Sequence, residues 1–242
     1  MGILRTKTIE PATGSTLTLG ASGDTITVSS DSIKANTFKD AGGNTLFTSD
    51  GAGTLSSINS GLSGGGGPIL ITSYTSGGVS AHEIQSGIDD TYDEYMLVFN
   101  DYGPATDNVN FQFQASIDGG SNYNVAITST AFEALHNEDG NGGALAYNTG
   151  DDQAQGTSYQ NLCFDLGNGT DESCAGILHL FNPASTTYVK HFYARFHGYH
   201  TSNYCIDNFV SGYFNTTSAI NALQFKMTSG VHDGHYSMYG IK

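Results

Sequence analysis

A run of four glycines followed by a proline, Gly64 to Pro68, divides this sequence into two parts of different character. Neither a helix nor a strand tolerates such a run, so it predicts a linker, which we place at residues 63–68. The part before it is rich in Thr, Ser and Gly, whereas the part after it is rich in aromatic residues. We therefore predict an N-terminal β-rich stalk or anchor over residues 1–62 and a C-terminal head over residues 69–242.

The composition favours an all-β protein. The chain has 14 Tyr, 13 Phe and 32 Gly but only 4 Pro, and 13% of its residues are charged. Aromatic residues favour strands and glycine favours turns, and no Glu-, Lys- and Ala-rich run indicates a long helix.

The N-terminal part alternates Thr with a few apolar residues, as in Leu17, Leu19, Ile26 and Val28. This period of two predicts short strands at residues 16–19 and 25–28, and further strands at 32–38 and 45–48. Each strand offers only one or two large apolar side chains, and an isolated hairpin of this kind is marginally stable in water. We therefore predict that three chains pool these faces in a homotrimer.

The C-terminal part alternates more clearly. Apolar residues face one way at Tyr95, Leu97 and Phe99, and again from Phe111 to Ile117. About eight strands over this length predict a β-sandwich of the jelly-roll type. Residues 131–157 are polar and Gly-rich, so we predict long loops there, with one short helical turn near residues 132–135. The other predicted strands lie at residues 123–129, 159–166, 176–181, 190–199, 222–228 and 236–241.

The net charge of −15 is concentrated in the head, because the residues before the linker are almost balanced. An acidic head repels phosphate backbones, so we expect no nucleic-acid partner. No apolar run approaches the roughly 18 residues of a membrane-spanning helix, so we expect no membrane partner. The three cysteines contain no CxxC motif, and their odd number predicts free thiols rather than a disulfide framework.

The segment at residues 189–200 is the richest in candidate binding residues. Alternation places Phe192, Ala194 and Phe196 on the core face of a strand. Aromatic rings beside Arg and His donors suit sugar recognition, but the same face can form a subunit interface or a plain solvated surface. The candidate ligand-binding or interface residues on the opposite face are His191, Tyr193, Arg195, His197 and Tyr199.

No motif in the sequence predicts a metal, a cofactor or catalysis. The histidine pairs 197/200 and 232/235 are each three residues apart, which places the members of a pair on opposite faces of a strand. The acidic residues at 89–94, 151–152 and 171–172 lack the spacing of a calcium loop, so we interpret them as solvated turns. The segment at residues 78–82 lacks the second glycine of a nucleophile elbow. We expect no enzyme activity.

Several segments resemble the fibre-like virion proteins of tailed bacteriophages, particularly marine ones. The resemblance covers both parts of the chain in patches, and its motifs are structural. The segments are ILRTKTIE at residues 3–10, GSTLTLGASGD at 14–24, YMLVF at 95–99, PATDNVN at 104–110, SIDGGSNY at 116–123 and YGIK at 239–242.

This resemblance implies a virion component that is assembled in the host cytoplasm. We expect a homotrimeric, tail-fibre-like adhesive protein whose C-terminal head contacts the host surface, with a host surface glycan as a candidate partner. The N-terminal region would then attach to other virion proteins. One alternative is a capsid-bound head fibre or decoration protein. A further alternative is a glycan-active enzyme or a carbohydrate-binding module.

Overall fold

The computed structural model describes residues 35–40, 42–52, 55–56, 58 and 67–242. The chain forms two compact units, Met1–Gly65 and Gly66–Lys242. The strands predicted at residues 16–19 and 25–28 lie outside the described residues, as does most of the predicted linker.

The described part of the N-terminal unit is a small antiparallel sheet of three strands, β1 (Thr37–Lys39), β2 (Thr45–Ser49) and β3 (Leu55–Ser56). Phe38 pairs with Phe47 across β1 and β2, and their rings stack with centroids 4.5 Å apart. The Asp40 carboxylate accepts hydrogen bonds from the backbone and side-chain nitrogens of Asn44 at 2.8 and 3.0 Å, which fixes the turn. None of the described side chains with an assigned burial is buried in this unit.

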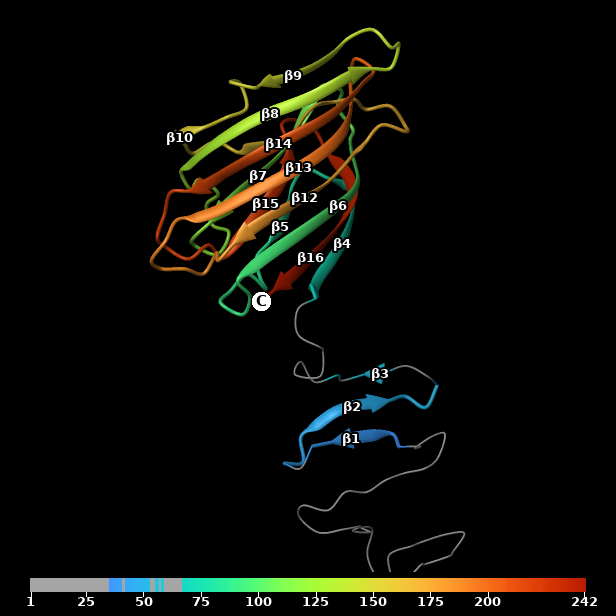
Figure 1. Cartoon of the computed structure of the whole chain (residues 1–242), viewed down its shortest axis with the longest axis vertical. Coiled ribbons are helices and arrows are strands. Elements are labelled where there is room, and N and C mark those ends of the chain that lie inside the picture. Colours follow the sequence, from blue (N-terminus) through green and yellow to red (C-terminus); the bar gives the residue numbers. More distant parts are fainter. Residues whose placement is uncertain (1–34, 41, 53–54, 57, 59–66) are drawn as a thin grey trace, which may run out of the picture. The chain divides into compact units, whose positions relative to one another are not determined.

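The C-terminal unit is all-β, and its described residues form no helix (Figure 1). Accordingly, no helix among them is long and apolar enough to cross a membrane. Its strands are β4 (Ile69–Val79), β5 (His82–Ile84), β6 (Glu94–Pro104), β7 (Val109–Ser116), β8 (Ile127–Asn137), β9 (Gly143–Tyr147), β10 (Ala154–Gly156), β11 (Gln160–Leu166), β12 (Cys174–Phe181), β13 (Lys190–His200), β14 (Tyr204–Phe214), β15 (Ala222–Met227) and β16 (His232–Ile241).

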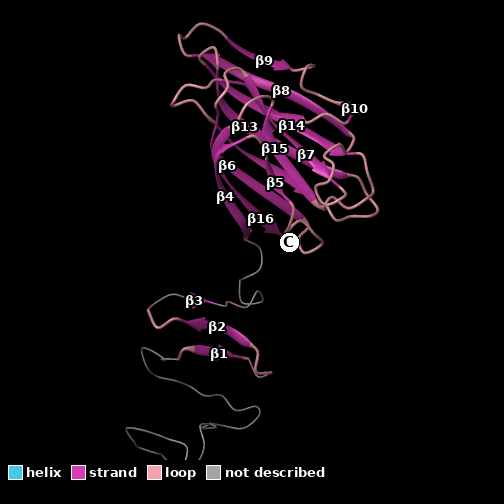
Figure 2. Cartoon of the chain, turned by 180° about the vertical axis from the view of Figure 1, so that it is seen from behind, coloured by secondary structure: helices cyan, strands magenta, loops and turns pink. Residues whose placement is uncertain are grey.

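These strands form a jelly-roll-like β-sandwich, with one large and one small layer (Figures 1 and 2). The large layer has the order β4-β16-β6-β12-β13-β14-β8, and β9 and β10 pair with the outer edge of β8. The small layer has the order β11-β7-β15-β5. The layers share a single ladder contact, between Leu166 on β11 and His200 on β13. All these pairings are antiparallel, and the chain repeatedly crosses from one layer to the other.

Aromatic rings fill the space between the layers. Phe99 on β6 lies at the centre, with its ring 5.0 Å from that of Phe225 and 5.5 Å from that of Phe196. Phe113 on β7 meets Phe192 on β13 at 5.1 Å. The alternation predicted for these strands is confirmed, because every core-face position named for β6 and for β13 is at most 3% exposed.

Three local predictions were wrong. Residues 131–157 do not form long loops throughout, since β8 runs from Ile127 to Asn137 and β9 and β10 follow it, and only residues 138–142 and 148–153 connect these strands. The helical turn expected near residues 132–135 is therefore part of a strand. Ile117 lies beyond the end of β7 and is 43% exposed, so it does not continue the core face of that strand.

Candidate functional site

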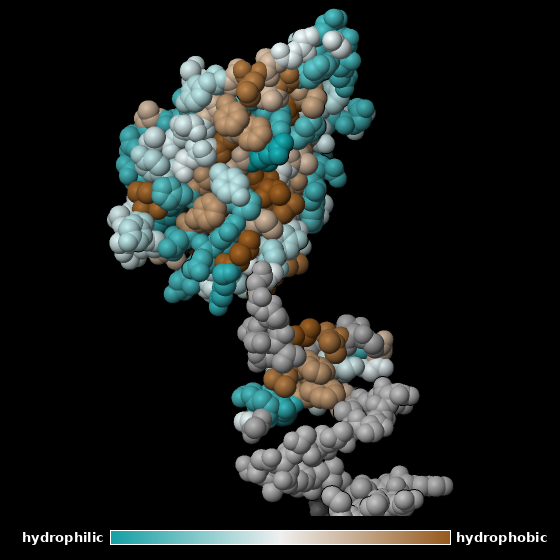
Figure 3. Space-filling model, viewed as in Figure 1, coloured by the Kyte–Doolittle hydropathy of each residue, from teal (hydrophilic) through white to brown (hydrophobic). Residues whose placement is uncertain are grey.

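The outward face of β13 carries the five candidate residues in the predicted alternation. His191, Tyr193, Arg195 and His197 are exposed and Tyr199 is half-buried, whereas the residues between them are buried. This face belongs to the large layer, whose outer surface is seen in Figure 3. Apolar residues gather there among polar ones.

Neighbouring strands add aromatic side chains to this surface. Antiparallel register places His179 of β12 and Ser211 of β14 beside Tyr193. It also places Phe209 of β14 beside Arg195, and Phe132 of β8 beside Phe209. β12 and β14 flank β13 in the sequence, whereas β8 lies far from it. The sequence predicted no strand at β14, so it did not indicate Phe209 and Phe132 as neighbours. The residues named here as the aromatic face are Phe132, His179, Phe181, His191, Tyr193, Arg195, Phe209 and Tyr213.

Two rings from β12 stack beside Tyr193. The imidazole of His179 stacks on the Tyr193 ring, with centroids 4.4 Å apart and planes 18° apart. Phe181 lies on the same strand as His179, and its ring centroid is 5.8 Å from that of Tyr193. The carboxylate of Glu94 contacts Nδ1 of His179, which fixes the orientation of the imidazole. These contacts hold Tyr193 in place although 46% of it is exposed.

Arg195 is held by an ion pair and by a ring. Its Nη2 donates to Oδ2 of Asp207 at 2.6 Å, and its Nε donates to Oδ1 at 3.1 Å. The hydrogen bonds with Asp207 raise the pKa of the guanidinium above its already high value, so the group stays charged. The guanidinium carbon lies 4.9 Å from the Phe209 ring centroid, within cation–π distance. A cation is thus fixed next to apolar ring surface.

Two shallow hollows lie on the aromatic face, and Tyr193 borders both of them. The larger one has a volume of about 430 Å³ and also contains hydroxyl groups, with Thr130 Oγ1 and Ser211 Oγ hydrogen-bonded at 3.1 Å. The smaller one has a volume of about 280 Å³ and is bordered by Phe132, Arg195 and Phe209. Ring surfaces next to hydroxyl groups and a cation suit a ligand that is partly apolar and partly polar.

The structure separates the five candidates into two groups. His191, Tyr193 and Arg195 border the hollows. His197 and Tyr199 border neither hollow and are engaged by other side chains. Nε2 of His197 lies 3.1 Å from Sγ of Cys205, and the Tyr199 hydroxyl donates to Oε2 of Glu138 at 3.0 Å.

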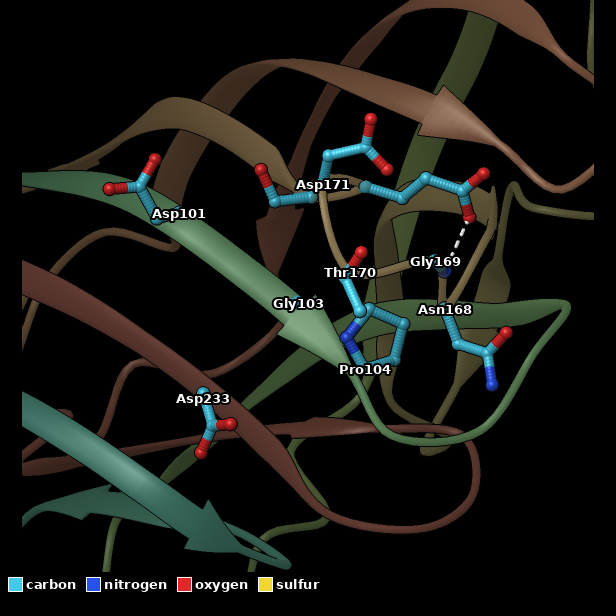
Figure 4. A pocket seen from close by; sticks show the side chains of 10 residues that line it. Asp101, Gly103, Pro104, Asn168, Gly169, Thr170, Asp171 and Asp233 are labelled. Carbon is cyan, nitrogen blue, oxygen red and sulfur yellow. Dashed lines mark hydrogen bonds between the residues drawn. The ribbon is translucent and has the colours of Figure 1, made fainter.

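A third hollow, of about 460 Å³, is acidic (Figure 4). Asp101, Asp171, Glu172 and Asp233 line it from β6, β16 and the loop between β11 and β12. Some of these carboxylates stabilise backbone turns, since Oε2 of Glu172 accepts the amide of Gly169 at 2.7 Å and Asp233 accepts another backbone amide. No cluster of three His, Cys, Asp or Glu suited to a metal ion occurs among the described residues.

The two histidine pairs are not brought together as shared ligands. His232 is 1% exposed and lies beside Tyr102, whereas Nδ1 of His235 hydrogen-bonds Thr75 Oγ1 at 3.0 Å. His200 faces Asp165 at 3.6 Å. Among the described residues, the aromatic face with its two hollows is therefore a better-formed candidate site than the acidic hollow or the histidine pairs.

Comparison with known proteins finds no matching family model, no matching curated protein and no matching solved structure.

Proposed function

We propose that this chain is a bacteriophage virion protein, a homotrimeric, tail-fibre-like adhesive protein that uses the aromatic face of its C-terminal unit to contact a glycan on the host surface. The observation that carries this proposal is the exposure of several aromatic rings around two hollows on one sheet face. The resemblance of the sequence to phage fibre proteins supplies the virion context.

Exposed rings on a rigid sheet favour carbohydrate as the partner. The apolar faces of sugar rings stack on aromatic side chains, while sugar hydroxyls take the adjacent hydrogen-bonding groups. Tyr193, Phe132 and Tyr147 are 46%, 40% and 54% exposed, and they lie on one face of the sheet, on β13, β8 and β9. A trimer repeated around a particle would strengthen weak binding at each such site through avidity.

The N-terminal unit supports assembly. Its described side chains with an assigned burial include no buried one, and the stacked pair Phe38 and Phe47 is half-buried at best. The described part of this unit forms no core of its own, and a small sheet of this kind gains stability by pooling apolar faces with other copies. We propose that this unit trimerises and attaches to other virion proteins.

Binding to bacterial cells and to an array of bacterial surface polysaccharides tests the proposal directly. The full chain should bind, and Tyr193→Ala should weaken each site about fivefold, because a ring contact contributes about 1 kcal/mol. Tyr188→Ala is the matched control, since Tyr188 is 70% exposed and borders neither hollow. Equal binding by the two variants would contradict a role for the aromatic face.

Two further readouts separate the alternatives. Gold-labelled antibody against the chain should mark the tail in electron micrographs of particles, whereas labelled capsids would favour the decoration protein. Incubation with a bound polysaccharide should leave its chain length unchanged, whereas shortened chains would indicate a glycan-active enzyme.

A further inference from the structure

Two of the three cysteines lie close together at the join between the layers. Cys163 lies on β11 of the small layer, and Cys174 begins β12 of the large layer. They are 0% and 2% exposed. Gly198 of β13 pairs directly with Cys174, near the point where β11 joins β13. The third cysteine, Cys205, is exposed on the outer surface.

Gly198 has no side chain, and the two cysteine side chains lie next to the space that a Cβ atom would occupy. A Cβ atom at this position would lie 2.6 Å from Sγ of Cys163 and 3.5 Å from Cβ of Cys174. Both cysteine side chains therefore lie beside the Cβ position of Gly198. Burial, followed by a side-chain hydrogen bond with Cys174, raises the pKa of the Cys163 thiol well above its usual value. The two cysteine side chains are thus close neighbours in the reduced protein.

We propose that Cys163 and Cys174 are a latent disulfide site, and that their oxidation cross-links the two layers of the sandwich. The bond requires the two sulfurs to approach to about 2.05 Å. The residues between the cysteines would form a short closed loop, and closing such a loop restricts the unfolded chain. The cross-link would therefore stabilise the C-terminal unit.

The oxidant in this reaction is a small-molecule disulfide such as oxidised glutathione. One cysteine thiolate attacks a glutathione sulfur, which forms a mixed disulfide and releases one reduced glutathione. The second cysteine thiolate then attacks the protein sulfur of the mixed disulfide and releases the second reduced glutathione. The two cysteines lose two protons and two electrons in total, and the glutathione disulfide gains them.

Burial controls when this exchange occurs. The thiolate is the reacting form, so a buried thiol with a raised pKa exchanges slowly in the folded state. Exchange then proceeds while the chain folds or when this corner of the sandwich opens. A reducing cytoplasm keeps both thiols free, whereas an oxidising medium favours the cross-link.

Refolding in a glutathione buffer tests the proposal independently of the proposed function. The full chain carrying Cys205→Ser is unfolded, and refolded with either oxidised or reduced glutathione. Peptide mapping without reductant should show one linked pair, Cys163 with Cys174, only in the oxidised sample. Thermal unfolding should then show a midpoint about 5–10 °C higher than that of the reduced sample.

A variant that also carries Cys174→Ala is the control and should show no difference between the two buffers. Recovery of Cys163 and Cys174 as free thiols or as separate glutathione adducts after oxidative refolding would overturn the proposal. So would a linked pair that leaves the unfolding midpoint unchanged or lowers it, because the cross-link would then not stabilise the sandwich. If the control variant does not fold, peptide mapping of the Cys205→Ser chain still shows whether the disulfide forms.

Discussion

The ring of Phe132 on β8 lies parallel to the ring of Phe209 on β14, with centroids 4.7 Å apart and planes 4° apart. The two residues are direct cross-strand neighbours on the solvent side of the large layer. Cross-strand aromatic pairs contribute about 0.5–1.5 kcal/mol beyond the area that they bury.

The double variant Phe132→Ala, Phe209→Ala should therefore be more stable than the sum of the single variants predicts. The expected coupling in the free energy of unfolding is about 1 kcal/mol. Urea unfolding of the wild type, the single variants and the double variant measures this coupling. Strict additivity would mean that the two rings do not stabilise each other.

The same two residues help to explain why β14 and most of β8 were not predicted. On β14, the inward positions include Asn208 and Gly212, whereas Phe209 and Tyr213 face outward. On β8, Ala131 is buried and Phe132 is exposed. The inward face of β14 also carries Ile206, Val210 and Phe214, so large apolar residues lie on both of its faces and the period-two signal is weak. The outward-facing rings of the aromatic face therefore weaken the sequence signal of these strands.

The face of β13 could be predicted because its inward positions follow the ordinary pattern. Phe192, Ala194 and Phe196 are buried, so His191, Tyr193 and Arg195 must face out. What surrounds them depends on strand order and register, which bring Phe209 next to Arg195 from a strand that the sequence did not indicate. Sequence periodicity contains no information about which strands become neighbours.

Phe99 should be among the most costly residues to truncate. It is 1% exposed and contacts rings from both layers. Phe99→Ala should lower the free energy of unfolding by about 3–5 kcal/mol, because it leaves a cavity in the core. Ile117→Ala is the control, and its effect should stay within about 0.5 kcal/mol, since Ile117 is 43% exposed. Similar urea midpoints for the two variants would contradict this position of the core.

His232 should make the fold sensitive to acid. Burial lowers its pKa from 6.5 to about 4, and neither ring nitrogen has a hydrogen-bond partner within the described structure. The unfolded chain therefore binds the proton more readily than the folded chain between these two values. Stability is fully present above about pH 6.5 and falls as the pH drops towards 4, by about 3 kcal/mol in total.

Urea unfolding at several pH values between 4.5 and 7 measures this dependence. His232→Phe should flatten it, because the phenyl ring takes no proton. His191→Gln should leave it unchanged, since His191 is exposed. If the free energy of unfolding of His232→Phe fell with pH as steeply as that of the wild type, other groups would cause the acid sensitivity. Burial also lowers the pKa of His82, so a residual slope of the same sign is expected.

The assembly prediction separates the roles of the two units. Light scattering of the full chain should give about three times the chain mass of 25.5 kDa. A fragment that starts at Pro68 should fold, because all the buried hydrophobic residues of the described structure lie in the C-terminal unit. It should also lose trimerisation, since the half-buried pair Phe38 and Phe47 would be absent. A monomeric full chain would remove the avidity on which strong attachment through weak sites depends.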